Sequence, residues 1–109
     1  MLELFQTEWC PASRRVRLRL TELGLDYLSR QVPVERDERT TLIEATGSDT
    51  IPVLRLENGS AVVGEENILS YLGEHHDEPA GAQAHRLKAA KARRRYLEEE
   101  CACLPAATP

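Results

Sequence analysis

The spacing of apolar residues in the first half of the chain predicts a strand, a helix, a second strand and a second helix. Val16, Leu20 and Leu23 recur at helical spacing, so they share one face of a helix, and Gly24 is a residue type at which helices commonly end. A weaker apolar repeat further on ends in the same way near Gly47. The four elements are predicted at Leu2–Gln6, Ser13–Leu23, Asp26–Val34 and Glu38–Thr46.

A hairpin and a third helix are predicted in the second half of the chain. Asn58 and Gly59 stand between two short apolar runs, and this dipeptide is the strongest short-range signal of a β-hairpin. The next helix begins with Glu65 and Glu66, whose negative charges complement the helix dipole. The two strands are predicted at Val53–Leu56 and Ala61–Val63, and the helix at Glu65–Glu74.

The resulting order, βαβ then α then ββα, predicts an α/β fold. A β-α-β start implies two parallel strands joined by a right-handed crossover, and the hairpin adds antiparallel strands on the other side of the same sheet. The prediction is a four-stranded mixed sheet of the thioredoxin-like type, followed by an extra C-terminal helix. The domain is expected at residues 1–76, a linker at 77–81, the extra helix at 82–104 and a disordered tail at 105–109.

The predicted C-terminal helix has high helix propensity but only a narrow apolar stripe. Three arrangements are therefore open: it docks on the body, it pairs with a partner helix, or it partly frays. A possible partner at this helix is part of the prediction.

Composition and charge narrow the class of protein. With 109 residues, 41% of them hydrophobic, the chain can form one domain with a core but not two of ordinary size. No apolar run approaches the length of a membrane-spanning helix, so we expect no membrane partner. The net charge is −4, with an acidic body over residues 1–80 and a basic region after it. The acidic body argues against a nucleic-acid partner and leaves only the basic region as a candidate for such contacts.

Cysteine usage and the N-terminus both favour the cytoplasm. The first residues show no secretory pattern, and three cysteines, an odd number, do not make a disulfide framework. Cys101 and Cys103 are an alternative redox or metal pair, but no companion cluster has metal-ligand spacing. We therefore predict no metal site.

Cys10 is the residue most suited to chemistry. It lies between a predicted strand and a predicted helix, where unpaired backbone N–H groups and the helix dipole stabilise a thiolate. Pro11 suits the first turn of a helix because no N–H needs a partner there, and Arg14 and Arg17 add positive potential. The alternative is a buried, inert cysteine that packs as a small apolar side chain. The neighbouring proline and arginines favour the reactive thiol.

Three segments resemble glutaredoxins and the N-terminal domains of glutathione transferases. Cys10–Ser13 reads Cys-Pro-Ala-Ser and resembles the Cys-Pro-x-Cys or Cys-Pro-x-Ser active site of glutaredoxins, and Thr50–Pro52 resembles their Thr/Ser-Val/Ile-Pro segment. Gly64–Leu72 is similar to the Glu-Ser-x-x-Ile-x-x-Tyr-Leu pattern of glutathione-transferase N-domains. The resemblance as a whole covers residues 2 to 74.

The resemblance implies a cis peptide bond before Pro52. That bond would hold Ile51 beside Cys10 and offer the backbone N–H and C=O of Ile51 to the cysteinyl part of glutathione. A cis bond costs little only before proline, and an exposed strand-like edge can accept a peptide. From the dipeptide alone a trans proline opening a strand is the better reading. Because this segment occurs together with the Cys10 motif, the cis form becomes the better interpretation.

The resemblance also implies that the helix starting near Glu65 receives the γ-glutamyl group of glutathione. Its backbone N–H groups would meet the carboxylate, and an acidic side chain would meet the amine. The ungapped match places Glu65 where the family has serine, whereas a shift of one residue makes Glu65 and Glu66 the usual pair. The alternative is that both are solvated acids that complement the dipole.

A cation for the glycine carboxylate of glutathione is not evident near Cys10. Many glutaredoxins carry a lysine three residues before the cysteine, where this chain has Thr7. Arg14, Arg36 and Arg39 are the candidates to replace it, unless they are ordinary surface charges. Arg14 is the one placed in the predicted binding site.

The leading hypothesis is a monothiol, glutathione-dependent thiol–disulfide oxidoreductase with Cys10 as nucleophile and glutathione as co-substrate. Ser13 occupies the place of the resolving cysteine, and its hydroxyl either caps the helix, hydrogen-bonds the thiolate or is a plain helix residue. The expected partners are glutathione or a small thiol and a disulfide-containing protein. The alternative is a glutathione-transferase N-domain-like binding module without turnover. A metal-cluster scaffold is disfavoured because cluster-binding glutaredoxins carry Cys-Gly-Phe-Ser instead.

Overall fold

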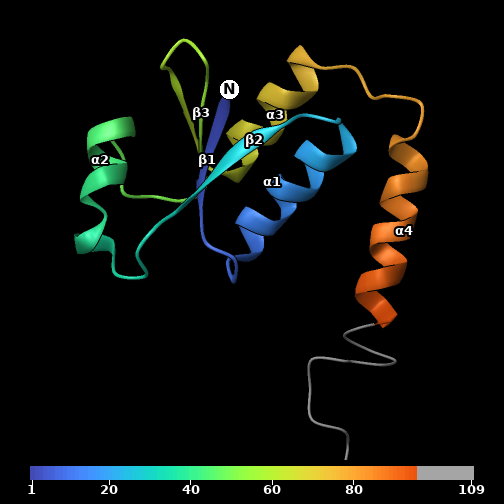
Figure 1. Cartoon of the computed structure of the whole chain (residues 1–109), viewed down its shortest axis with the longest axis horizontal. Helices are drawn as coiled ribbons and strands as arrows, with labels where there is room; N and C mark the ends of the chain where they lie inside the picture. The colour runs from blue at the N-terminus through green and yellow to red at the C-terminus, as the bar shows by residue number, and fades with distance from the viewer. Residues whose placement is uncertain (96–109) are drawn as a thin grey trace, which may run out of the picture.

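A four-stranded mixed sheet forms the centre of the fold (Figure 1). The strands lie in the order β2-β1-β3-β4; β1 and β2 are parallel, and β3 is antiparallel to both β1 and β4. The predicted α/β fold of the thioredoxin-like type is therefore confirmed. The computed structural model describes residues 1–95, with strands β1 (Leu2–Gln6), β2 (Tyr27–Gln31), β3 (Val53–Arg55) and β4 (Ala61–Val63).

Alternating side chains along β1 and β3 build a core on each face of the sheet. Leu4 and Leu54 pack in the cluster beneath α1 and α3, whereas Phe5 and Val53 pack in the cluster beneath α2. All four side chains are at most 3% exposed. Because successive strand residues point to opposite faces, the same two strands hold both layers of helices in place. The helices are α1 (Pro11–Glu22), α2 (Thr40–Thr46) and α3 (Glu65–His75).

Most element boundaries lie within one residue of the sequence predictions, and two of the larger differences have local reasons. α1 begins at Pro11 rather than at Ser13, because the side chain of Cys10 caps the first turn. β2 ends at Gln31 rather than at Val34, since the chain passes into a proline-containing loop that cannot continue the ladder. The earlier start of α1 places the cysteine directly at the end of a helix.

A buried arginine organises the segment between β2 and β3. The predicted helix over Glu38–Thr46 is divided into a 3-10 turn at Arg36–Glu38 and α2, which starts at Thr40. Arg39 lies between the two and is only 5% exposed. It is therefore not one of the surface cations available to a ligand carboxylate. Its guanidinium donates hydrogen bonds to the carbonyl oxygens of Pro33 (2.8 Å), Val34 (2.9 Å) and Asp49 (2.8 Å).

The C-terminal helix α4 (Ala82–Arg94) lies beside α1 and runs antiparallel to it (Figure 1). The Arg86 guanidinium donates hydrogen bonds to Glu22 (2.9 Å) and to Glu78 (2.6 Å). Arg19 of α1 bonds to the same two carboxylates, at 3.3 and 2.7 Å respectively. Of the three arrangements left open by the sequence, α4 thus docks on the body, and it does so through ion pairs.

The described part of the apolar stripe of α4, Leu87 and Ala90, docks only in part. Leu87 is 61% exposed, whereas Ala90 lines a groove between α4 and α1 and Ala82, at the start of α4, is buried. The predicted continuation of the helix to residue 104, the tail at 105–109, and Cys101 and Cys103 lie outside the described residues. Within residues 1–95, no helix is both long enough and apolar enough to cross a membrane.

Replacing Arg39 with alanine is expected to lower the free energy of unfolding by about 2–3 kcal/mol, because three charge-assisted hydrogen bonds and a buried side-chain stem are lost. Urea denaturation measures this change. Arg36→Ala is the matched control, since the Arg36–Asp49 ion pair is exposed and worth about 1 kcal/mol at most. Equal losses for both variants would contradict the structural role of Arg39.

Candidate functional site

Cys10 occupies the point at which β1 has ended and α1 begins. Its backbone is extended, and its Sγ accepts a hydrogen bond from the N–H of Ser13 at 3.4 Å, so the thiol is the N-cap of the helix. Pro11 follows as the first helical residue and needs no N–H partner there. The thiol is half-buried rather than enclosed. It is therefore both accessible and directed at the positive end of the helix.

The surroundings of Cys10 favour the thiolate. Burial raises the pKa of the Cys10 thiol, but the Ser13 side chain, the N–H groups of Ser13 and Ala12 and the charge of Arg15 together lower it below its ordinary value. Ser13 is fully buried, and its hydroxyl has no hydrogen-bond partner with normal geometry within the described residues. The nearby Cys10 sulfur, once ionised, is the acceptor through which the Ser13 side chain lowers the pKa of the thiol. Ser13 is thus neither the helix cap nor an exposed helix residue.

Arg17 positions the loop that leads to Cys10. Its guanidinium donates hydrogen bonds to Gln6 Oε1 and to the carbonyl oxygens of Thr7 (3.3 Å) and Glu8 (3.4 Å). Gln6 is itself fully buried at the end of β1. These hydrogen bonds hold the charge of Arg17 beside the loop that carries Cys10, and its predicted contribution of positive potential at the thiol stays a prediction.

The strand next to β1 brings a second backbone segment to the same end of the sheet. In the antiparallel register Phe5 lies opposite Val53, so Ile51 arrives level with the loop that follows β1. The Ile51–Pro52 peptide bond is cis, as the resemblance implied. The Pro52 carbonyl accepts the N–H of Gly64 at 2.9 Å, whereas Ile51 forms no backbone hydrogen bond within the described residues. The polar groups of Ile51 are therefore available for an extended ligand.

The N-terminus of α3 faces α1 across the site. Gly64 precedes it with φ 91° and no side chain to cap the first turn. Glu65 forms a two-point ion pair with Arg15, in which Arg15 Nε contacts Oε2 and Arg15 Nη2 lies 2.9 Å from Oε1. This contact lowers the pKa of the Glu65 carboxyl through the Arg15 hydrogen bond and charge. Glu66 is exposed at the second helical position.

Arg15 is the functional side chain that the sequence analysis missed. It lies between the two predicted site residues Cys10 and Glu65, and it acts on the pKa of both. The only sign of this role in the sequence is the position of Arg15 in the predicted helix, five residues after Cys10. Arg14, which was predicted here, instead lines a groove towards α4 with Leu18.

Other groups near the site have simpler roles. Arg36, a second predicted candidate for a ligand carboxylate, is paired with Asp49 at 2.9 Å. Trp9 precedes the thiol and is 63% exposed, so its ring is available as a wall for a substrate rather than part of the core.

Among residues 1–95 no group of three histidine, cysteine or acidic side chains is placed to hold a metal ion.

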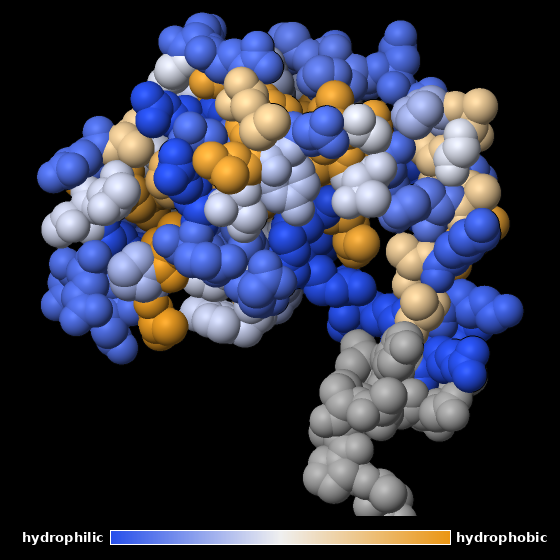
Figure 2. Space-filling view, viewed as in Figure 1, coloured by the Kyte–Doolittle hydropathy of each residue, from blue (hydrophilic) through white to orange (hydrophobic). Residues whose placement is uncertain are grey.

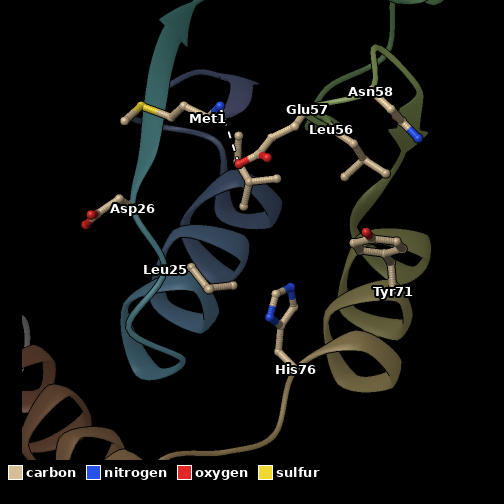
Figure 3. A pocket seen from close by; sticks show the side chains of 9 residues that line it. Met1, Leu25, Asp26, Leu56, Glu57, Asn58, Tyr71 and His76 are labelled. Atoms are coloured by element: carbon tan, nitrogen blue, oxygen red, sulfur yellow. Dashed lines mark ion pairs between the residues drawn. The ribbon is translucent and has the colours of Figure 1, made fainter.

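A hollow of about 710 Å³ lies at the start of β1, at the end of the sheet opposite to Cys10 (Figure 3). Met1 and Leu25 line it beside the start of β1, and Tyr71 and His76 contribute from the end of α3. Because Cys10 follows the other end of β1, this hollow is separate from the thiol site.

Comparison with known proteins identifies related folds. The family described as glutathione S-transferase, N-terminal domain, matches residues 4–80. No curated protein matches the sequence. A glutathione S-transferase from Rhodospirillum rubrum F11 is 28% identical with a TM-score of 0.61, and the match covers 88% of this chain and 46% of that one.

Two further solved structures carry glutathione. Rice GST1 in complex with glutathione is 26% identical with a TM-score of 0.58, covering 84% of this chain and 44% of that one. A glutathione transferase family member from Pseudomonas fluorescens Pf-5 with bound glutathione has a TM-score of 0.65 at 24% identity, covering 94% and 59%, and shows the shared fold alone. The chain spans roughly half the length of the solved structures that it matches.

Replacing Glu65 with glutamine is expected to lower the pKa of Cys10 further, because the charge of Arg15 is then no longer neutralised. Arg15→Gln is expected to raise that pKa. The rate of alkylation of Cys10 as a function of pH gives both midpoints, and the wild-type midpoint should lie below about 8.5. Arg55→Gln, at the other end of the sheet, is the control and should leave the midpoint unchanged. Identical midpoints in all four proteins would exclude control of the thiol by Arg15.

Proposed function

Because the chain belongs to the glutathione S-transferase N-terminal domain family, we propose that it acts on glutathione at Cys10 as a monothiol thiol–disulfide oxidoreductase. The observation that carries the proposal is the placement of a half-buried thiol as N-cap of α1, with its pKa lowered by the helix and by Arg15. A nucleophilic thiolate is what disulfide exchange requires.

The proposed reaction reduces a mixed disulfide between glutathione and a substrate thiol in two exchanges. The Cys10 thiolate attacks the glutathione sulfur, the substrate sulfur leaves as a thiolate and takes a proton, and Cys10 becomes bonded to glutathione. A second glutathione thiolate then attacks that same glutathione sulfur, which releases the Cys10 thiolate and forms oxidised glutathione. Ser13 has no sulfur, so the second step needs the external thiol. The substrate partner is a disulfide-containing protein or a small thiol.

Two backbone segments are proposed to bind glutathione. The unpaired N–H and C=O of Ile51, held next to Pro52, would pair with the cysteinyl residue as an added strand. The uncapped first turn of α3 would receive the γ-glutamyl carboxylate through its N–H groups. Since the Glu65 carboxylate is already paired with Arg15, we propose that the exposed Glu66 binds the amine of the γ-glutamyl group. The Arg15–Glu65 pair also removes most of the repulsion that an isolated Glu65 would exert on the ligand carboxylate.

A binding module without turnover is the second candidate. It is favoured by one observation, that the family model matched over residues 4–80 describes the N-terminal domain of a transferase rather than a whole enzyme. In this case glutathione would bind to Ile51 and to the N-terminus of α3, while the groups that carry out a reaction on it would not be among the described residues.

The two candidates are distinguished by glutathione-dependent reduction of a small mixed disulfide in a coupled assay. The oxidoreductase predicts turnover by the wild type, and loss of at least about 100-fold in Cys10→Ser because the nucleophile is removed. Glutathione binding, measured by calorimetry, should persist in that variant. Binding without turnover in the wild type would reject the enzyme and favour the module.

A further inference from the structure

The tip of the β3–β4 hairpin, residues 57–60, carries an asparagine followed directly by a glycine. All four residues of the tip are exposed, and Figure 2 shows hydrophilic residues along the upper edge of the molecule, where Figure 1 places this tip. Figure 3 shows the side chains of Glu57 and Asn58 leaving the tip on different sides. Water therefore reaches the Asn58 amide, and Gly59 has no side chain that could shield its own backbone nitrogen.

The Asn58 side chain is placed for attack by the main chain that follows it. The backbone nitrogen of Gly59 and Cγ of Asn58 are separated by the number of bonds that closes a five-membered ring. The Ser60 N–H donates a hydrogen bond to Asn58 Oδ1 at 2.9 Å. This donor can stabilise the negative charge that develops on Oδ1 when Cγ is attacked. Within residues 1–95 the Asn58 Nδ2 group forms no hydrogen bond that would hold it in place.

Two backbone hydrogen bonds keep the tip closed. The Gly59 N–H donates to the Leu56 carbonyl at 3.0 Å, and the Leu56 N–H donates to the Ser60 carbonyl at 2.8 Å. The attacking nitrogen is engaged until the first of these bonds opens. Both bonds adjoin an exposed turn between strands of only three residues, and such segments open at a low cost in free energy. The reaction in the folded chain therefore needs a local opening and not global unfolding.

Asn67, the other asparagine in the sequence, is held in the opposite way. It lies inside α3, and its Nδ2 donates a hydrogen bond to the Val63 carbonyl at 2.9 Å. The next residue, Ile68, is fully buried, and its N–H donates to the Gly64 carbonyl at 3.0 Å within the helix. The β-branched side chain also crowds the nitrogen that would have to attack. Asn67 is thus a control within the same molecule.

We propose that Asn58 is a modification site, at which the folded chain deamidates through a succinimide formed with Gly59. The Gly59 nitrogen bonds to Cγ of Asn58 and loses its proton. The Cγ–Nδ2 bond breaks, and Nδ2 takes up a proton and leaves as ammonia. Water then adds to one of the two carbonyl carbons of the ring, which yields aspartate or isoaspartate at position 58. No electron is transferred, and water is the only co-reactant.

The modification changes the hairpin and leaves the thiol site intact. A new carboxylate at position 58 adds to that of Glu57 on the lining of the hollow that also contains Met1. Isoaspartate also lengthens the main chain of the turn by a carbon atom, which disturbs the hydrogen bonds that close the tip. Cys10 lies at the opposite end of the sheet, so the inference does not depend on the proposed function.

Peptide mass spectrometry after incubation of the full chain in neutral buffer measures both asparagines in one sample. The peptide with Asn58 should gain about 1 Da, and an isoaspartyl methyltransferase should label part of the product. The peptide with Asn67 should remain unchanged over the same time. A parallel incubation in concentrated urea gives the rate without structure. The folded chain should react at Asn58 at most about thirtyfold more slowly than in urea, because only the hydrogen bonds of the tip must open.

Two matched variants assign the reaction to Asn58. Asn58→Gln should abolish the mass gain, because the longer side chain cannot close the five-membered ring. Asn67→Gln makes the same change at an exposed position of α3 and should leave the rate unchanged. The proposal is overturned if the folded chain keeps Asn58 intact while the chain in urea loses it, since the hairpin then protects the amide. A mass gain that persists in Asn58→Gln also overturns it.

Discussion

The hydrogen bond from the Ser13 N–H to Cys10 Sγ is the contact on which the candidate site depends. It makes the thiol the cap of α1, and so it joins a chemical group to the end of a helix whose N–H groups need an acceptor. The sheet then fixes what surrounds that cap. β3 pairs with β1 so that Ile51 arrives beside the loop, and α3 packs so that Glu65 reaches Arg15.

The arginines of α1 show how helical geometry distributes like charges among different roles. Successive residues are rotated by about 100° around a helix, so neighbours in sequence point to different surroundings. Arg15 acts on the thiol, and Arg17 holds the loop that precedes it. Arg19 docks α4, and Arg14 lines the groove between α1 and α4.

The sequence predicts most of the fold because its strongest signals are local. Asn58 and Gly59 specify the hairpin, and the proline after Cys10 marks the start of a helix. The directions of long side chains are not local, since they depend on what the folded chain brings near. The burial of Arg39 against loop carbonyls and the pairing of Glu65 with Arg15 could not be read from spacing alone. For the same reason the role of Arg15 at the thiol could not be predicted from the sequence.

The most direct test of the central claim, that Cys10 is the reactive thiol of a monothiol site, is to map the adduct formed with oxidised glutathione. The full chain is incubated with the disulfide, and its mass and cysteine-containing peptides are then determined. The account predicts one glutathione per chain, attached to Cys10 and released by excess thiol. Attachment at Cys101 or Cys103 alone, or an internal disulfide from Cys10 to either, would contradict it.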